Sequence, residues 1–72
     1  MLMRLLINGD SRLIPGMTEF GALDHVLSAL SIRKELVAVA LNDIIVPRAL
    51  WDKTTVADGD RVEVVHFVGG GS

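Results

Sequence analysis

A single stretch of this 72-residue chain has the apolar spacing of an α-helix, and that stretch limits the folds open to the rest. Four apolar side chains fall on one helical stripe, at i, i+3, i+4 and i+7: Leu23, Val26, Leu27 and Leu30. Thr18 is suited to cap the N-terminus of this helix, so the pattern predicts a helix over residues 19–30. With one helix, the other apolar segments are expected to form a sheet that the helix covers on one face.

A tight hairpin is predicted near the N-terminus. An apolar run over residues 2–7 ends at Asn8-Gly9, and a return strand over residues 10–14 closes at Pro15-Gly16. Asn-Gly favours a two-residue hairpin turn because both of its positions require a positive φ.

A second hairpin follows the helix. Residues 36–41 are a continuous run of Leu, Val and Ala, Asn42-Asp43 is a turn dipeptide, and residues 44–46 form the return strand. Pro47 ends this strand because proline cannot donate a ladder hydrogen bond.

The rest of the second half is predicted to be a loop, a turn and a final strand. Residues 48–55 form the loop, which is expected to pack Leu50 and Trp51 over the edge of the core. Asp58-Gly59 is a turn, and residues 61–68 read as the last strand.

This order of hairpin, helix, hairpin, loop and strand predicts an α+β fold. The simplest arrangement is a mixed sheet of about five strands with the helix on one face, and with the last strand between its neighbours and parallel to the first. That arrangement is the β-grasp. We expect one domain over residues 1–68 and a flexible glycine tail over residues 69–72, because glycine has no side chain to pack and the most backbone entropy to lose.

The composition excludes several classes of function. The formal net charge is −2 with the charges scattered, so no basic patch favours nucleic acid. The chain contains no cysteine, which excludes disulfides, thiolate catalysis and cysteine metal sites and fits a cytoplasmic protein. No apolar run approaches the roughly 20 residues of a membrane span. Asp58 and Asp60 are too few ligands for a metal site.

The second half of the chain resembles the ThiS family, the sulfur carrier proteins of thiamine biosynthesis. The resemblance rests on an ordered set of motifs that ends in a diglycine: Val39-Ala40-Leu41-Asn42, Ile45-Val46-Pro47-Arg48, Trp51, and Asp58-Gly59-Asp60-Arg61-Val62-Glu63-Val64-Val65-His66-Phe67-Val68-Gly69-Gly70. Over the first half it is a matter of pattern.

The resemblance implies a ubiquitin-like β-grasp domain that is a co-substrate and not an enzyme. It implies that an activating enzyme (ThiF) uses ATP to adenylate the C-terminal glycine, and that sulfur from a cysteine desulfurase converts the adenylate to a thiocarboxylate. Thiazole synthase (ThiG) would then take the sulfur. The carrier itself would bind no cofactor, and its residues Gly69, Gly70 and Gly71 would thread into the partner because glycine has no Cβ.

One departure from the family pattern concerns the acyl end. ThiS proteins end in Gly-Gly, whereas this chain ends in Gly-Gly-Gly-Ser, so its free carboxylate belongs to Ser72. A peptidase could remove Ser72 and expose Gly71 as the attachment residue, or Gly71 and Ser72 could be additions to a natural end at Gly70. The chain could also be an inactive form, or the glycines a plain linker.

The last strand is expected to present one face to a partner. Alternation predicts that Val62, Val64 and His66 face the helix, with His66 a structural residue. Val65 and Phe67 then lie on the opposite face beside the tail. Together with Val68 and Arg48 they are predicted to bind the activating enzyme and the synthase, unless they merely cover the open face of the sheet.

Three alternatives to the thiamine carrier remain. A related carrier, such as the small subunit of molybdopterin synthase or a carrier for cysteine synthesis, shares the fold and the tail. A β-grasp binding module would use the tail only as a linker. A protein modifier would be conjugated to lysines.

Overall fold

The computed structural model describes residues 3–16 and 20–67, except the side chain of Phe20. In chain order the elements are β1 (Met3–Ile7), β2 (Asp10–Ile14), β3 (Phe20–Ala22), α1 (Leu23–Ala29), the 3₁₀ turn η1 (Lys34–Leu36), β4 (Val37–Leu41), β5 (Ile44–Val46), the 3₁₀ turn η2 (Arg48–Leu50), β6 (Thr55–Ala57) and β7 (Arg61–His66). No helix in the described ranges is long and apolar enough to cross a membrane.

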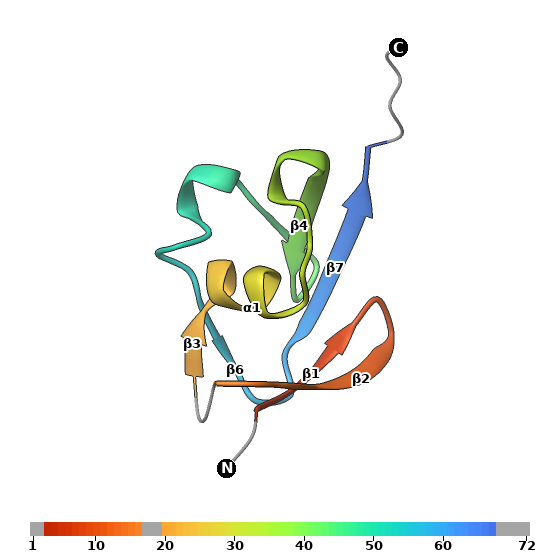
Figure 1. Ribbon diagram of the computed structural model, residues 1–72, viewed down its shortest axis with the longest axis vertical. Helices are drawn as coiled ribbons and strands as arrows, with labels where there is room; N and C mark the ends of the chain where they lie inside the picture. The colour runs from red at the N-terminus through yellow and green to blue at the C-terminus, as the bar shows by residue number, and fades with distance from the viewer. Residues whose placement is uncertain (1–2, 17–19, 68–72) are drawn as a thin grey trace.

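The main sheet is mixed and has five strands, in the order β2-β1-β7-β4-β5. The last strand, β7, lies at its centre, parallel to β1 and antiparallel to β4. Helix α1 covers one side of this sheet, with β3 and β6 beside it (Figure 1). The predicted β-grasp architecture is therefore confirmed.

Both predicted hairpin turns are present, with the backbone conformation that their residues favour. Asn8 and Gly9 have φ of 51° and 88°, and Asn42 and Asp43 have φ of 49° and 71°. Positive φ at both turn positions matches the right-handed twist of the flanking strands. The β1–β2 and β4–β5 hairpins thus follow from local sequence.

The hydrophobic core lies between α1 and the inner face of the sheet. It takes alternate residues from the strands and the helical stripe; its largest fully buried side chains are Met3, Leu5, Ile14, Leu23, Leu27, Val26, Val39, Val56 and Val62. Trp51 is 2% exposed, and its Nε1 donates to the Val46 carbonyl at 2.9 Å. Full burial of one such aliphatic side chain stabilises the fold by about 1.5–3 kcal/mol.

The predicted start of the helix is wrong. Helix α1 begins at Leu23, because residues 20–22 form β3 and pair antiparallel with β6. The Leu23 N–H donates to the Thr54 carbonyl at 2.8 Å, and the Asp24 N–H donates to the Trp51 carbonyl at 3.0 Å. These main-chain acceptors take the place of a capping side chain, and the predicted cap, Thr18, lies outside the described residues.

Four smaller predictions also need correction. Leu50 is 46% exposed, because η2 turns it outward while Trp51 alone fills the core. Leu36 belongs to η1 and not to the following strand, and Thr55 belongs to β6 and not to the loop. His66 is exposed although it alternates with Val62 and Val64 and pairs with the buried Val37 at the last position of the β4–β7 register.

Candidate functional site

The candidate site is the C-terminal end of β7 and the surface around it. Strand β7 runs through the middle of the sheet toward the end of the chain, at the top of the view in Figure 1. After it, the Phe67 N–H donates to the Leu36 carbonyl at 2.8 Å. The predicted attachment and tail residues, Gly69, Gly70 and Gly71, and the predicted contact residue Val68, lie outside the described residues.

The other edge of β7 is held by a side chain. The Val64 N–H donates to the Oδ1 of Asn8 at 2.7 Å, and the Nδ2 of Asn8 donates to the Val64 carbonyl at 3.1 Å. The end of β7 is therefore bonded to β4 and η1 along one edge and to the tip of the β1–β2 hairpin along the other.

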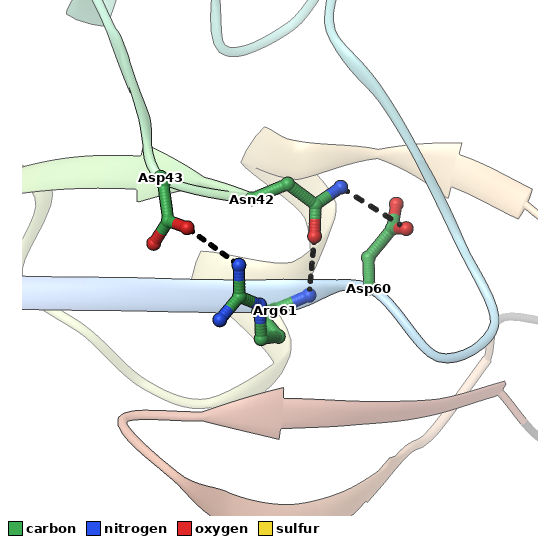
Figure 2. Close-up of polar contacts among 4 residues, drawn as sticks. All are labelled: Asn42, Asp43, Asp60 and Arg61. Carbon is green, nitrogen blue, oxygen red and sulfur yellow. Dashed lines mark hydrogen bonds and ion pairs between the residues drawn. The ribbon is translucent and has the colours of Figure 1, made fainter.

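The opposite end of β7 lies in a polar network (Figure 2). The Arg61 N–H donates to the Oδ1 of Asn42 at 2.9 Å, and the Nδ2 of Asn42 donates to Asp60 at 3.3 Å. The Arg61 guanidinium lies 2.6 Å from the Asp43 carboxylate. Asn42 thus joins the β4–β5 turn to the first residue of β7.

The side-chain carboxylates of the two aspartates around the Gly59 turn accept hydrogen bonds from main-chain N–H groups. Asp58 accepts the Arg4 N–H at 2.7 Å, and Asp60 accepts the Ala57 N–H at 2.8 Å. In the described part of the chain no group of three or more His, Cys, Asp or Glu side chains could hold a metal ion. Asp58 and Asp60 instead fix the turn that leads into β7.

The outer face of the sheet carries an apolar groove next to the end of β7. Its floor is two small residues of β4: Ala38 pairs with Val65 of β7, and Ala40 pairs with Ile45 of β5. Val65 and Ile45 are 62% and 70% exposed. Between them lies a groove of about 470 Å³, at one end of which Glu63 adds a charge.

A second groove of about 290 Å³ adjoins the first and shares Ala38, Val39 and Ile45 with it. Phe67, 61% exposed, and Arg48 both line this second groove. Three of the predicted contact residues, Val65, Phe67 and Arg48, thus lie on two adjoining grooves. We call this combined surface the exit face, defined by Ala38, Ala40, Ile45, Arg48, Val65 and Phe67.

Sequence reasoning missed two parts of this site. Ile45 is predicted as part of a return strand and of the ThiS-like motif but not as a contact residue, although the Asn42-Asp43 turn fixes its register and alternation along the strand places its side chain outside. Asn8 was read only as a turn residue. No local signal shows that its side chain reaches Val64, which is 56 positions away in the sequence.

The strand order defines the class of β-grasp domains, and in the sequence the central strand is followed three residues later by the glycine run Gly69-Gly70-Gly71. The model of the ThiS family matches residues 5–71, nearly the whole chain. The protein belongs to the ThiS family.

The proteins similar to this chain include thiazole synthases and proteins named ThiS. A thiazole synthase from Paramagnetospirillum magneticum is 40% identical over 70 residues, which are 97% of this chain and 21% of that protein. The sulfur carrier protein ThiS of Bacillus subtilis is 31% identical over 67 residues, 93% of this chain and 98% of that protein. The crystal structure of the thiamine biosynthesis protein ThiS from Geobacter metallireducens matches with a TM-score of 0.82 at 41% identity, covering 96% of this chain and 100% of that one.

The share of each relative's own length that this chain covers differs between the thiazole synthases and the ThiS proteins. The chain spans about a fifth of the length of the thiazole synthase from P. magneticum, and 20% of another from Magnetococcus marinus, to which it is 36% identical. It matches the Bacillus and Geobacter proteins over nearly their whole length.

Proposed function

We propose that this protein is a sulfur carrier of thiamine biosynthesis, whose C-terminal glycine carboxylate is adenylated and then converted to a thiocarboxylate. Membership of the ThiS family and the end-to-end likeness to the Bacillus sulfur carrier support this proposal. The observation that carries it is the position of the glycines in the sequence, where they begin three residues after the central strand of a hydrogen-bonded sheet. The protein is then a co-substrate acting in the cytoplasm, and ATP is bound by its partner.

The chemistry requires only a terminal carboxylate. With a pKa of roughly 3.5, that carboxylate is ionised at neutral pH. One of its oxygens attacks the α-phosphorus of ATP, and pyrophosphate leaves. A sulfur nucleophile then adds to the acyl carbon of the adenylate, and AMP leaves with the bridging oxygen. A cysteine desulfurase is the proposed source of this sulfur, carried as a persulfide whose terminal sulfur attacks. A thiol reductant then cleaves the S–S bond of the resulting acyl disulfide and leaves the thiocarboxylate.

The proposed partners are a ThiF-like adenylating enzyme and a ThiG-like thiazole synthase. Support for the second comes from the two thiazole synthases that contain a segment similar to nearly all of this chain. In those proteins a related segment and a thiazole synthase share one polypeptide.

The exit face is the proposed docking surface for both partners. Among its exposed apolar side chains, Val65 lies near the end of β7 and Phe67 directly after the strand, while Ile45 lies on β5 across the two alanines. Burial of an exposed apolar surface favours association at about 25 cal/mol per Å² removed from water, before the costs of association. Arg48 and Glu63 at the margins supply charges that can set the orientation of a partner.

Exchange of labelled pyrophosphate into ATP tests the adenylation step. Three chains, ending at Gly70, Gly71 and Ser72, are each incubated with a ThiF-like enzyme, ATP and labelled pyrophosphate. We expect carrier-dependent exchange for a chain that ends in glycine and none for the chain that ends at Ser72 unless a peptidase removes the serine. The enzyme is shown to be active with its own carrier. Absence of exchange with all three chains under those conditions would contradict the proposal.

A further inference from the structure

Strand β7 extends beyond the strand that lies parallel to it. The β1–β7 register ends where Ile7 pairs with Val62, and β7 continues to His66. Within the described residues, the last main-chain hydrogen bond between β7 and the β1–β2 hairpin is donated by the Asn8 N–H to the Val62 carbonyl, at 2.9 Å. Beyond it, no strand among residues 3–16 and 20–67 lies beside the edge of β7 that faces β1.

The side chain of Asn8 occupies the position of the missing strand. In a continued parallel ladder, the Asn8 carbonyl would accept the Val64 N–H, and the N–H of residue 10 would donate to the Val64 carbonyl. The chain instead turns away at Asn8. The side-chain amide provides both the acceptor, at 2.7 Å, and the donor, at 3.1 Å.

The turn alone does not require asparagine at this position. Asn8 has a φ of 51°, a conformation that glycine adopts without steric cost. A Gly-Gly dipeptide would therefore close the same hairpin. What glycine could not supply is the amide group that bonds Val64.

We propose that Asn8 is a positioning residue that aligns the end of β7, and with it the tail, for delivery to the activating enzyme. This inference rests on the proposed carrier function. Without the amide, β7 after Val62 is held only along the edge that faces β4 and η1, where the Phe67 N–H bonds the Leu36 carbonyl. The end of the strand then swings more widely, and the carboxylate spends less time in line with ATP.

Asn42 offers a matched control. It occupies the same position of the other hairpin, has a φ of 49°, and also bonds β7 through both atoms of its amide, but at Arg61 and Asp60, where β7 begins. Asn42→Gly therefore removes the same chemical group at the same kind of turn. A purely structural role of the amide predicts the same outcome for the two variants.

The experiment compares unaltered chain, Asn8→Gly and Asn42→Gly, each made with a C-terminal glycine that the activating enzyme accepts. Steady-state kinetics of adenylation give kcat and KM, and ¹⁵N relaxation gives backbone order parameters for residues 65–67. For Asn8→Gly we expect kcat to fall about tenfold with KM unchanged, because misalignment affects the reacting geometry more than docking. We also expect lower order parameters at residues 65–67. For Asn42→Gly we expect both readouts to match the unaltered chain.

A second variant keeps the test decisive if Asn8→Gly does not fold. Asn8→Asp tolerates the same φ and keeps the acceptor for the Val64 N–H, but it sets an oxygen against the Val64 carbonyl. The kcat of Asn8→Asp should lie between that of the unaltered chain and that of Asn8→Gly. If Asn8→Gly is unfolded, the kcat of Asn8→Asp should still lie below that of the unaltered chain. Equal kcat values for the position 8 and position 42 variants, with unchanged order parameters, would overturn the role of Asn8 and leave the proposed carrier function standing. If the unaltered chain is not adenylated at all, the proposed function fails instead.

Discussion

The two ends of β7 are built from different chemistry. At its start, Arg61 is tied to Asn42 and Asp43 by hydrogen bonds and an ion pair, and Asp60 fixes the turn that precedes it. At its far end, Val65 and Phe67 present exposed apolar side chains, and in the sequence the glycines follow shortly after them. Polar groups that are already hydrogen-bonded within the chain gain little free energy from contact with a partner. Exposed apolar surface is stabilised only when something covers it. One end therefore anchors the strand, and the other is suited to meet a partner.

The largest expected effect lies in the tail, beyond the far end. In the Gly70→Ala, Gly71→Ala double variant, the added Cβ atoms should clash where the tail threads into the enzyme, so adenylation should fall by about 100-fold or more. The comparison uses chains that end at residue 71, and the rate is followed by pyrophosphate exchange. The midpoint of thermal unfolding should not change, since the fold does not depend on these residues. Full activity of the double variant would indicate a binding module with a linker.

The next effect is expected on the exit face. Val65→Asp places a charge on the exposed apolar groove and should weaken binding to the activating enzyme by about tenfold, measured as Kd by titration calorimetry. Leu13→Asp is the matched control, because Leu13 is an exposed apolar residue on β2, outside both grooves. If both variants bind like the unaltered chain, the exit face is not the docking surface.

A smaller effect is expected at the start of β7, on stability rather than on charging. Asn42→Ala loses the amide and also forces a Cβ into positive φ, whereas Asn42→Gly loses the amide alone. The alanine variant should therefore lose about 1–2 kcal/mol more free energy of unfolding than the glycine variant, measured by urea denaturation. A greater loss for glycine would mean that the turn conformation costs less than we infer.

The smallest effect concerns the ion pair beside Asn42. The Arg61 and Asp43 side chains are 54% and 65% exposed, so solvent screens their attraction. Asp43→Asn should lower the free energy of unfolding by about 0.2–1 kcal/mol at low salt, and the difference should shrink at about 1 M salt. A difference that persists at high salt would point to the turn conformation of Asp43 and not to its charge.

The parts of the fold that could be predicted depend on short-range signals. Asn8-Gly9 and Asn42-Asp43 combine residues that tolerate positive φ, so each hairpin could be located from two adjacent residues. The apolar stripe of the helix is likewise a short-range signal, because its residues are only three or four positions apart. Three of them, Leu23, Val26 and Leu27, are buried in the structure. Once these elements are fixed, the central place of β7 follows from packing a single helix on one sheet.

The parts that were missed depend on distant pairing. Strand β3 exists only because residues 20–22 meet residues 55–57, and each partner is three residues long with no strong strand signal of its own. The start of α1 is likewise set by the carbonyls of Thr54 and Trp51. The capping preference of Thr18 therefore predicts a start that is too early in the sequence.

The candidate site divides in the same way. Val65 and Phe67 could be placed on the outer face by alternation along one strand. The groove itself needs the register of three strands, which brings Ile45 and Val65 to opposite sides of two alanines, Ala38 and Ala40. In the sequence those alanines belong to an apolar run that reads simply as core.

The central claim is that a rigid domain delivers a main-chain carboxylate to the active site of another protein. Intact-mass spectrometry of the chain ending at Gly71 tests it most directly, after incubation with ATP, a ThiF-like enzyme and a sulfur donor. We predict a gain of about 16 Da, from oxygen replaced by sulfur at the terminal carboxylate, and fragmentation should place that gain on the last residue. An unchanged mass with an enzyme that charges its own carrier, or sulfur found on any other residue, would contradict the claim.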